Sequence, residues 1–253
     1  MRQTERLAAI LEELSTDRSV SVAALSRRLG ASAATIRRDL QLLQDQRLLS
    51  RTHGGAIAHG VLYELPIRYK GARRREEKRR IAAAAVTRID DGMTVGLTGG
   101  TTCTEVARAL VEHARLTIVT NALNIASELA VRPNLRLVLT GGTARPESYE
   151  LVGPIAERTL EGLQLDVAII GVDGIDATHG CTTHHEVEAH TNATLIACAR
   201  RVIVVADASK IGATAFARIC TIDAVDELIT DRAAGVRELH AIREAGVRVE
   251  TVP

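Results

Sequence analysis

Seven short apolar runs, most of them separated by stretches of helical character, make up the chain from residue 91 onward. The runs lie at residues 93–97, 117–119, 136–139, 166–170, 202–206, 227–229 and 247–249. The helical stretches lie near residues 104–113, 122–130, 154–163, 186–199 and 234–245. Short buried strands that alternate with helices form a mostly parallel sheet with both faces covered. This alternation therefore predicts an α/β fold for most of the chain.

Glycines and small polar residues follow these apolar runs. They are Thr98–Thr102, Thr120-Asn121, Thr140–Gly142, Gly171–Gly174, Asp207 and Thr230-Asp231. Open parallel sheets bind ligands at the carboxyl ends of their strands. Each group alone is more typical of an ordinary turn, but their repetition predicts one polar crevice along this edge of the sheet.

One of these groups has the composition of an anion-binding loop. The run Gly99-Gly100-Thr101-Thr102 leads directly into a helical stretch. Its glycines let backbone N–H groups approach an anion, and a helix N-terminus adds partial positive charge. The same run is equally typical of a structural helix cap. Lys210 favours the anion site because it is the only Lys after residue 78 in a chain with 29 Arg, although a surface Lys is the alternative.

The first sixty residues have a different organisation. Residues 7–14 carry apolar side chains at helical spacing, a second helix is predicted between Ser21 and Gly30, and a third begins near Ser32. Residues 48–57 then have the pattern strand, glycine turn, strand. This order predicts a winged helix-turn-helix. A helical bundle with solvated arginines is the alternative.

The charge distribution favours DNA as the partner of this region. Residues 1–80 hold 17 basic and 9 acidic groups, whereas residues 81–253 hold 15 and 22. Small residues let the start of the third helix enter a major groove, and its arginines reach phosphates or guanine edges. The predicted DNA-contacting residues are Ser32, Ala33, Thr35, Arg37, Arg38, Arg51 and His53.

Two motifs of this region resemble the signature of the DeoR family of bacterial transcription regulators. They are Ala33-Ala34-Thr35-Ile36-Arg37-Arg38-Asp39-Leu40 and Arg51-Thr52-His53-Gly54-Gly55-Ala56. The resemblance implies a winged helix-turn-helix and a Rossmann-like effector domain, similar to pentose-phosphate isomerases, that senses a phosphorylated sugar or related metabolite. It also implies repression of sugar or related metabolite catabolism. Within the first motif, we expect Asp39 to brace a neighbouring Arg rather than to contact DNA.

The resemblance extends to the strand ends of the second domain. The effector-binding residues that it implies are Gly99, Gly100, Thr101, Thr102, Thr120, Asn121, Gly141, Gly142, Asp173, Glu188 and Lys210. Two positions depart from the family pattern. Thr98 stands where many members carry an acid, and Asn192 stands where a basic residue is frequent. These departures leave the identity of the sugar open.

An isomerase-like enzyme fused to a DNA-binding domain is the alternative function. The run Asp173-Gly174-Ile175-Asp176 resembles the acidic motif of the isomerases, in which paired carboxylates act as general acid and base. Those enzymes also use a Lys shortly after this motif. Here no Lys lies between Lys78 and Lys210, and histidines occupy the interval. We therefore predict a sensor with no catalytic residues.

Other classes of site and location receive little support from the sequence. The four cysteines show no spacing typical of a disulfide framework or a zinc site. His184 with Glu188 or His190 can share a helix face, but no further ligand pattern follows, so we expect neither a metal nor a cofactor. No apolar run is long enough to span a membrane, and the charged N-terminus is unlike a signal peptide. We expect a cytoplasmic protein.

These patterns predict three regions and a symmetric assembly. Residues 1–57 form the DNA-binding domain, residues 58–75 form a linker, and residues 76–253 form the effector-binding and oligomerisation domain. One short recognition helix reads few base pairs, so we expect at least a dimer, a homodimer or homotetramer, on paired half-sites of double-stranded operator DNA.

Overall fold

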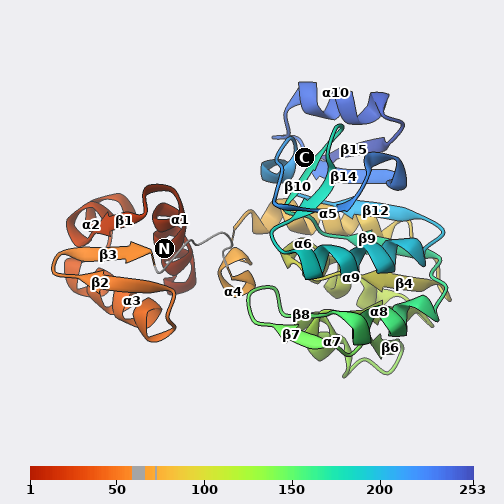
Figure 1. Ribbon diagram of the computed structural model, residues 1–253, viewed down its shortest axis with the longest axis horizontal. Coiled ribbons are helices and arrows are strands. Elements are labelled where there is room, and N and C mark those ends of the chain that lie inside the picture. The colour runs from red at the N-terminus through yellow and green to blue at the C-terminus, as the bar shows by residue number, and fades with distance from the viewer. Residues whose placement is uncertain (59–65, 72) are drawn as a thin grey trace. The chain divides into compact units, whose positions relative to one another are not determined.

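The computed structural model describes residues 1–58, 66–71 and 73–253, and these residues divide into two compact units (Figure 1). The first unit covers Met1–Arg73 and the second covers Arg74–Pro253. Residues 59–65 and 72 of the predicted linker therefore lie outside the described residues. Within the described ranges, no helix has the length and apolar character that a membrane span requires.

The first unit is a winged helix-turn-helix, as predicted. Its elements are α1 (Gln3–Asp17), β1 (Ser19–Ser21), α2 (Val22–Leu29), α3 (Ala33–Asp45), β2 (Leu49–Thr52), β3 (Gly55–Ala58) and α4 (Ile67–Lys70). The three strands form an antiparallel sheet in the order β1-β3-β2, in which β2 and β3 are the expected wing. The sequence did not indicate β1, which adds a third strand to that wing.

Local sequence signals set the helix boundaries of this unit. The Ser21 side chain accepts the N–H of Ala24 at the start of α2, and the Ser32 side chain accepts the N–H of Thr35 at the start of α3. Gly30 ends α2 with a φ of +61°, a conformation that residues with a Cβ adopt at a cost. The tight turn between α2 and α3 therefore follows from two residues that the sequence identifies, Gly30 and Ser32.

A short helix lies in the region predicted as a linker. Helix α4 begins directly after Pro66, and its Tyr69 is buried against the core of the first unit. The Tyr69 hydroxyl donates a hydrogen bond to Oε1 of Gln46 at the end of α3. Part of the region between the predicted domains is thus packed onto the first unit.

The second unit contains the α/β fold predicted from the alternating pattern. Its helices are α5 (Arg75–Val86), α6 (Thr101–Ala109), α7 (Leu123–Leu129), α8 (Pro154–Glu161), α9 (Glu186–Ala197), α10 (Val236–Glu244) and the 3-10 turns η1 (Leu110–Glu112), η2 (Ala208–Lys210) and η3 (Ile222–Ala224). The strands of its main sheet are β4 (Thr94–Leu97), β5 (Thr117–Thr120), β6 (Arg136–Leu139), β9 (Val167–Ile170), β12 (Val202–Val205), β14 (Glu227–Asp231) and β15 (Arg248–Val252). All seven predicted strands are confirmed.

The order of the strands places the topological switch point at the centre of the sheet. The main sheet is parallel throughout, in the order β15-β14-β12-β9-β4-β5-β6. The chain runs outward from β4 through β5 to β6 and then returns to the other side of β4 with β9. The topological switch point therefore lies between β4 and β9, where open α/β sheets bind ligands.

The second unit also contains two smaller sheets, and the apolar pattern did not predict either of them. One is the hairpin of β7 (Thr143–Arg145) and β8 (Glu150–Val152). The other is antiparallel and joins β10 (Gly174–Asp176), β11 (Gly180–Thr183) and β13 (Ala217–Cys220) in that order.

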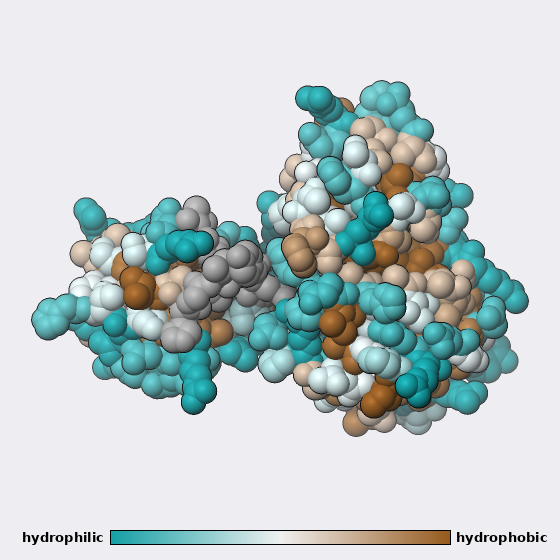
Figure 2. Space-filling model, in the orientation of Figure 1, coloured by the Kyte–Doolittle hydropathy of each residue, from teal (hydrophilic) through white to brown (hydrophobic). Residues whose placement is uncertain are grey.

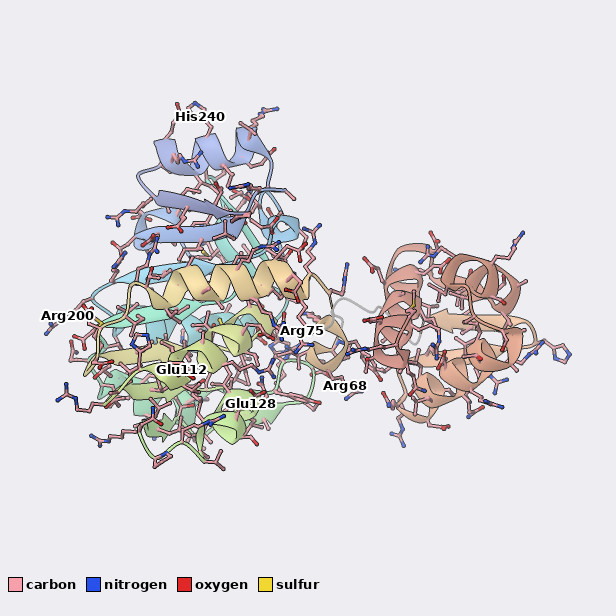
Figure 3. The ribbon with its side chains drawn as sticks, turned by 180° about the vertical axis from the view of Figure 1, so that it is seen from behind. Arg68, Arg75, Glu112, Glu128, Arg200 and His240 are labelled. Carbon is pink, nitrogen blue, oxygen red and sulfur yellow. The ribbon has the colours of Figure 1, made fainter. Side chains whose placement is uncertain are left out.

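Helices cover both faces of the main sheet and form two cores. Helices α5, α6 and α7 pack on one face, and helices α8, α9 and α10 pack on the other. Alternate residues of one strand serve the two cores: Ile169 of β9 faces the first, and Ile170 faces the second. Each fully buried side chain of this size contributes about 1.5–3 kcal/mol. The side chains of Arg200 and His240 point outward from this unit (Figure 3).

Candidate functional site

The N-terminal turn of α3 exposes two arginines. Arg37 and Arg38 are solvent-exposed, whereas the preceding residue, Ile36, is buried. Ser32 caps the helix, and its hydroxyl also lies 2.9 Å from the hydroxyl of Thr35. Ala33 and Thr35 are half-buried. Small residues and two free-standing cations thus occupy the part of α3 that the sequence assigns to DNA.

Asp39 braces an arginine, as expected from the sequence. Its carboxylate is 1% exposed and accepts two hydrogen bonds from the guanidinium of Arg6 on α1, of which that from Nη2 is 3.1 Å long. This hydrogen bonding raises the pKa of Arg6. The ion pair joins α1 to α3, and it fixes the helix that carries Arg37 and Arg38.

The wing is tied to α3 by a second contact. Arg51 of β2 donates a hydrogen bond to Oε1 of Gln41, and Nε2 of Gln41 donates to Asp45 at 2.8 Å. Arg51 and His53 are both exposed. The wing residues named from the sequence therefore lie on a hairpin anchored to α3.

In the second unit, two hydrogen bonds connect three adjacent strand ends. Thr98, after β4, accepts the N–H of Gly171, after β9, on its hydroxyl at 3.0 Å. Lys210, in the turn after β12, donates from Nζ to Oδ1 of Asp173 at 3.1 Å. The loops that follow β4, β9 and β12 are therefore joined at the switch point of the sheet. The Lys210 side chain stays 28% exposed.

The glycine loop ends at the N-terminus of α6, whose first N–H groups have no partner within the helix. Gly100 precedes α6 with a φ of +107°, and the first helical hydrogen bond runs from the Thr104 N–H to the Gly100 carbonyl. The N–H groups of Thr101 and Thr102 lie before this bond, and no side chain caps the helix. Thr101 is half-buried and Thr102 is 7% exposed. This terminus has the donors and the partial positive charge that bind anions.

A buried carboxylate that the sequence did not single out holds the base of this loop. Oε1 of Glu150, the first residue of β8, accepts the Gly99 N–H at 2.6 Å, and Glu150 is 2% exposed. A Cβ on residue 99 would lie 2.3 Å from this oxygen, so a larger residue would force the Glu150 side chain to move. A carboxylate therefore reaches the glycine loop, which follows Thr98, from the β7–β8 hairpin.

Asp173 and Glu188 form the centre of a network of charged side chains. The Thr183 hydroxyl lies 3.2 Å from Oδ2 of Asp173 and 2.8 Å from Oε1 of Glu188. Glu188 also accepts a hydrogen bond of 2.8 Å from Nη1 of Arg145 on β7. With Lys210 on Asp173, the network has a cation at each end and two carboxylates between them. Arg145 is a second residue of the site that sequence reasoning missed.

Lys78 of α5 lies near the turn after β12 that carries Lys210. It is 4% exposed, and its Nζ lies 3.9 Å from Oδ2 of Asp207, the residue that begins the Lys210 turn. Arg74 Nε lies 3.7 Å from the other Asp207 oxygen. Burial raises the pKa of Asp207, but hydrogen bonds from Ser209 and the charges of Lys78 and Lys210 outweigh it and lower the pKa. Sequence reasoning missed Lys78, although the rarity of Lys in this chain, which pointed to Lys210, was a signal that could have found it.

Four of the predicted effector residues lie at the ends of β5 and β6, near the β7–β8 hairpin. Thr120 and Asn121 are fully buried, and the Thr120 hydroxyl donates to the Leu97 carbonyl at 2.8 Å. Asn121 donates from Nδ2 to Asn192 at 3.2 Å, and its carbonyl accepts the N–H of Leu151. Gly141 and Gly142 lead into the hairpin with positive φ values. The side chains of Thr120 and Asn121 are therefore not exposed at the strand ends, whereas Gly141 and Gly142 are half-buried.

Asp176, the second acid of the isomerase-like motif, anchors a turn. Its carboxylate accepts hydrogen bonds from the N–H groups of Thr178 and His179 and from the Thr214 hydroxyl, at 2.6–2.9 Å. Burial raises the pKa of Asp176, but bonds from the backbone and side chain of His179 outweigh it and lower the pKa. A carboxylate with a lowered pKa and several donors stays ionised, so it does not act as a general acid.

Metal binding receives no support in the part of the chain that the structure describes. No three His, Cys, Asp or Glu side chains are grouped there in a way that would hold an ion. His184 lies 3.8 Å from Oδ1 of Asp173, and His190 lies 3.8 Å from Glu157.

Comparisons with known proteins cover almost the whole chain. Residues 6–59 match the family model of the DeoR-like helix-turn-helix domain, and residues 73–232 match that of the DeoR C terminal sensor domain. The chain is 38% identical over 250 residues to the HTH-type transcriptional regulator GlpR of Haloferax volcanii, with 98% of each chain covered. It is 34% identical over 250 residues to the glycerol-3-phosphate regulon repressor of Escherichia coli K12, with 99% of each covered. Among solved structures, ribose 5-phosphate isomerase A of Methanocaldococcus jannaschii is similar over 54% of each chain, with 20% identity and a TM-score of 0.40.

Proposed function

Because the chain belongs to the DeoR family of DNA-binding transcription regulators, we propose that it represses genes of sugar or related metabolite catabolism and is released by a phosphorylated sugar. Its curated relatives are transcription regulators, and this chain is a regulator rather than an enzyme. In our proposal, residues 1–57 bind the operator, residues 58–75 link the domains, and residues 76–253 bind the effector and oligomerise.

The DNA-binding part of the proposal rests on the exposed cations of α3 and the wing. Arg37 and Arg38 read guanine edges or hold phosphates, while Arg51 and His53 contact the backbone beside the major groove. Ser32, Ala33 and Thr35 let the N-terminal turn of α3 come close to the bases. The buried Arg6–Asp39 pair keeps α3 in the orientation that this docking requires.

The observation that carries the effector assignment is the connection of three strand ends at the switch point. The free N–H groups at the start of α6 bind the phosphate, and Lys210 and Lys78 supply positive charge from the β12 side. Asp173 and Glu188 accept hydrogen bonds from the sugar hydroxyls, and Arg145 orients Glu188. Gly99 and Gly100 shape the loop.

The residues at the ends of β5 and β6 contribute to the same pocket in this proposal. Thr120 and Asn121, which are fully buried here, reach the effector together with Gly141 and Gly142 when the β7–β8 hairpin shifts. The ligand then binds one arrangement of the hairpin more tightly than the other. Such differential affinity is what allows an effector to change operator binding.

A dimeric or tetrameric regulator in the cytoplasm completes the proposal. Paired half-sites on DNA require two recognition helices. The second unit also exposes the large apolar side chains Val131, Ile155, Phe216 and Val236, and the space-filling view shows apolar patches on an otherwise hydrophilic surface (Figure 2). Such patches are suited to contacts between subunits.

A ligand screen with an operator readout tests this function. Thermal unfolding is measured with glycerol 3-phosphate and with pentose and hexose phosphates, and each unphosphorylated compound is the matched control. A ligand at a hundred times its Kd adds about 2.7 kcal/mol and raises the Tm by several degrees. The same compound should weaken operator binding in gel shifts. Equal effects of phosphorylated and unphosphorylated compounds would refute the phosphate assignment.

A further inference from the structure

Cys181 and Cys220 face each other across two antiparallel strands. They are direct partners in the register of β11 and β13, and both are free thiols. Directly opposite residues of an antiparallel pair have Cα atoms about 4.5–5.5 Å apart. This separation is inside the range of about 4.4–6.8 Å that a disulfide spans. The fold therefore places the two thiols opposite each other on neighbouring strands, at a separation that a disulfide can span.

The two thiols differ in exposure and in acidity. Cys181 is fully buried, whereas Cys220 is half-buried. Interaction with the thiol and the N–H of Cys181 lowers the pKa of Cys220 against the effect of burial. The same interaction between the two thiols, together with burial, raises the pKa of Cys181. Cys220 is therefore the accessible nucleophile, and Cys181 is held behind it as its partner.

The other two cysteines have different surroundings. Burial raises the pKa of Cys103 to about 12, and its thiol contacts Thr98 and the Ile169 carbonyl. Cys198 donates a hydrogen bond to the Leu160 carbonyl at 3.2 Å. The β11–β13 pair is thus the one place in the described chain where two cysteines are partners in a strand register.

We propose that Cys181 and Cys220 form a reversible thiol–disulfide site whose co-reactant is a low-molecular-weight disulfide such as oxidised glutathione. The Cys220 thiolate attacks one glutathione sulfur, the glutathione S–S bond breaks, and one glutathione leaves as a thiol after protonation. Cys181 then loses its proton and attacks the Cys220 sulfur of the mixed disulfide, and the second glutathione leaves. Two protein thiols are oxidised to one disulfide, and one oxidised glutathione is reduced to two thiols.

This site is next to residues of the proposed effector crevice. The register of β11 against β13 shifts between Cys181 and Thr182, and the following Thr183 contacts both Asp173 and Glu188. An S–S bond of about 2.05 Å is shorter than a hydrogen-bonded contact between sulfurs, so oxidation pulls β11 toward β13. We infer that it displaces Thr183 and weakens ligand binding. This consequence, unlike the cysteine pair itself, rests on the proposed function.

Thiol counting on the full-length protein tests the pair. The reduced protein contains four thiols. After equilibration with oxidised glutathione and denaturation without reductant, we expect two titratable thiols, a mass lower by two hydrogens and one cross-linked peptide that joins residues 181 and 220. Four remaining thiols, a lasting glutathione adduct on Cys220, a link between other cysteines or a disulfide between chains would each overturn the proposal.

Matched variants sharpen this result. Cys198→Ser removes a half-buried thiol outside the pair, so its count should fall from three to one on oxidation. Cys220→Ser should keep all three of its thiols, and Cys220→Ala repeats the measurement should the serine variant fail to fold. The cross-linked peptide of the wild-type protein needs no variant at all.

Ligand affinity of the oxidised and reduced wild-type protein tests the link to the crevice. A phosphorylated sugar that binds the reduced protein should bind the oxidised protein at least tenfold more weakly, and dithiothreitol should restore its affinity. Equal affinities would refute this link. The thiol count needs no ligand, so failure of every phosphorylated sugar to bind would count against the proposed function alone.

Discussion

The substitution Asp39→Asn should strongly destabilise the DNA-binding unit. It keeps the size of a side chain that is 1% exposed, but it removes the charge that Arg6 pairs with and puts an amide in place of one carboxylate oxygen. Arg6 is itself only 12% exposed, so its guanidinium would remain largely buried without a counter-ion. Removal of one partner of a buried pair costs about 3–5 kcal/mol. Because Arg6 retains some solvent contact, we expect a value near the lower end.

Urea unfolding and gel shifts measure this effect. A loss of about 3 kcal/mol in a unit of 73 residues corresponds to a fall in Tm of roughly 12–24 °C. Operator affinity at 37 °C should fall with the folded fraction, although Asp39 does not contact DNA in our proposal. The matched control is Glu12→Gln, which removes the same charge from an ion pair with Arg73 whose partners are 48% and 45% exposed. Exposed pairs contribute about 0–1 kcal/mol.

The unfolding free energies of the two variants test whether burial of the ion pair matters. If Asp39→Asn and Glu12→Gln lowered the unfolding free energy equally, burial of the Arg6–Asp39 pair would not matter and the reasoning would be wrong. A variant that unfolds normally but loses operator binding would instead place Asp39 at the DNA.

Three further predictions concern the DNA surface, the crevice and the sheet. Arg37→Ala should weaken operator binding by about 1–3 kcal/mol at one base position if it reads a base, or uniformly across sequences if it holds a phosphate; unchanged binding removes Arg37 from the interface. Lys210→Ala should abolish the ligand-induced Tm rise and leave operator binding intact, and a normal ligand response would exclude Lys210. Arg88 and Arg201 lower the pKa of buried Glu227 against the effect of burial. Ionised Glu227 therefore stabilises the folded protein at pH values above the ordinary Glu pKa. This stabilisation is lost as the pH falls through the lowered pKa. Glu227→Gln should therefore destabilise the protein at pH 7, with a difference in urea midpoint that shrinks toward pH 4; a constant difference would contradict this account.

The local features of the fold were predictable because adjacent residues determine them. Ser21, Gly30 and Ser32 set the ends of two helices through caps and a positive φ, which depend on residues a few positions away. The main-sheet strands are continuous apolar runs because both of their faces are covered. The small strands β7, β8, β10, β11 and β13 are three or four residues long, and many of their residues are polar, so they carry no such signal.

The sequence by itself determined the two-part organisation, the strands of the main sheet with the helices between them, and the strand ends at which we propose that a ligand binds, since periodicity, charge and turn residues are local quantities. Only the tertiary structure decided which side chains meet at those ends. Glu150 and Arg145 arrive from a hairpin, and Lys78 arrives from a helix more than 120 residues before Lys210. The pairing of Cys181 with Cys220 likewise depends on the register of two strands about forty residues apart. Packing of distant segments creates these contacts, and no pattern along the chain encodes the distance between them.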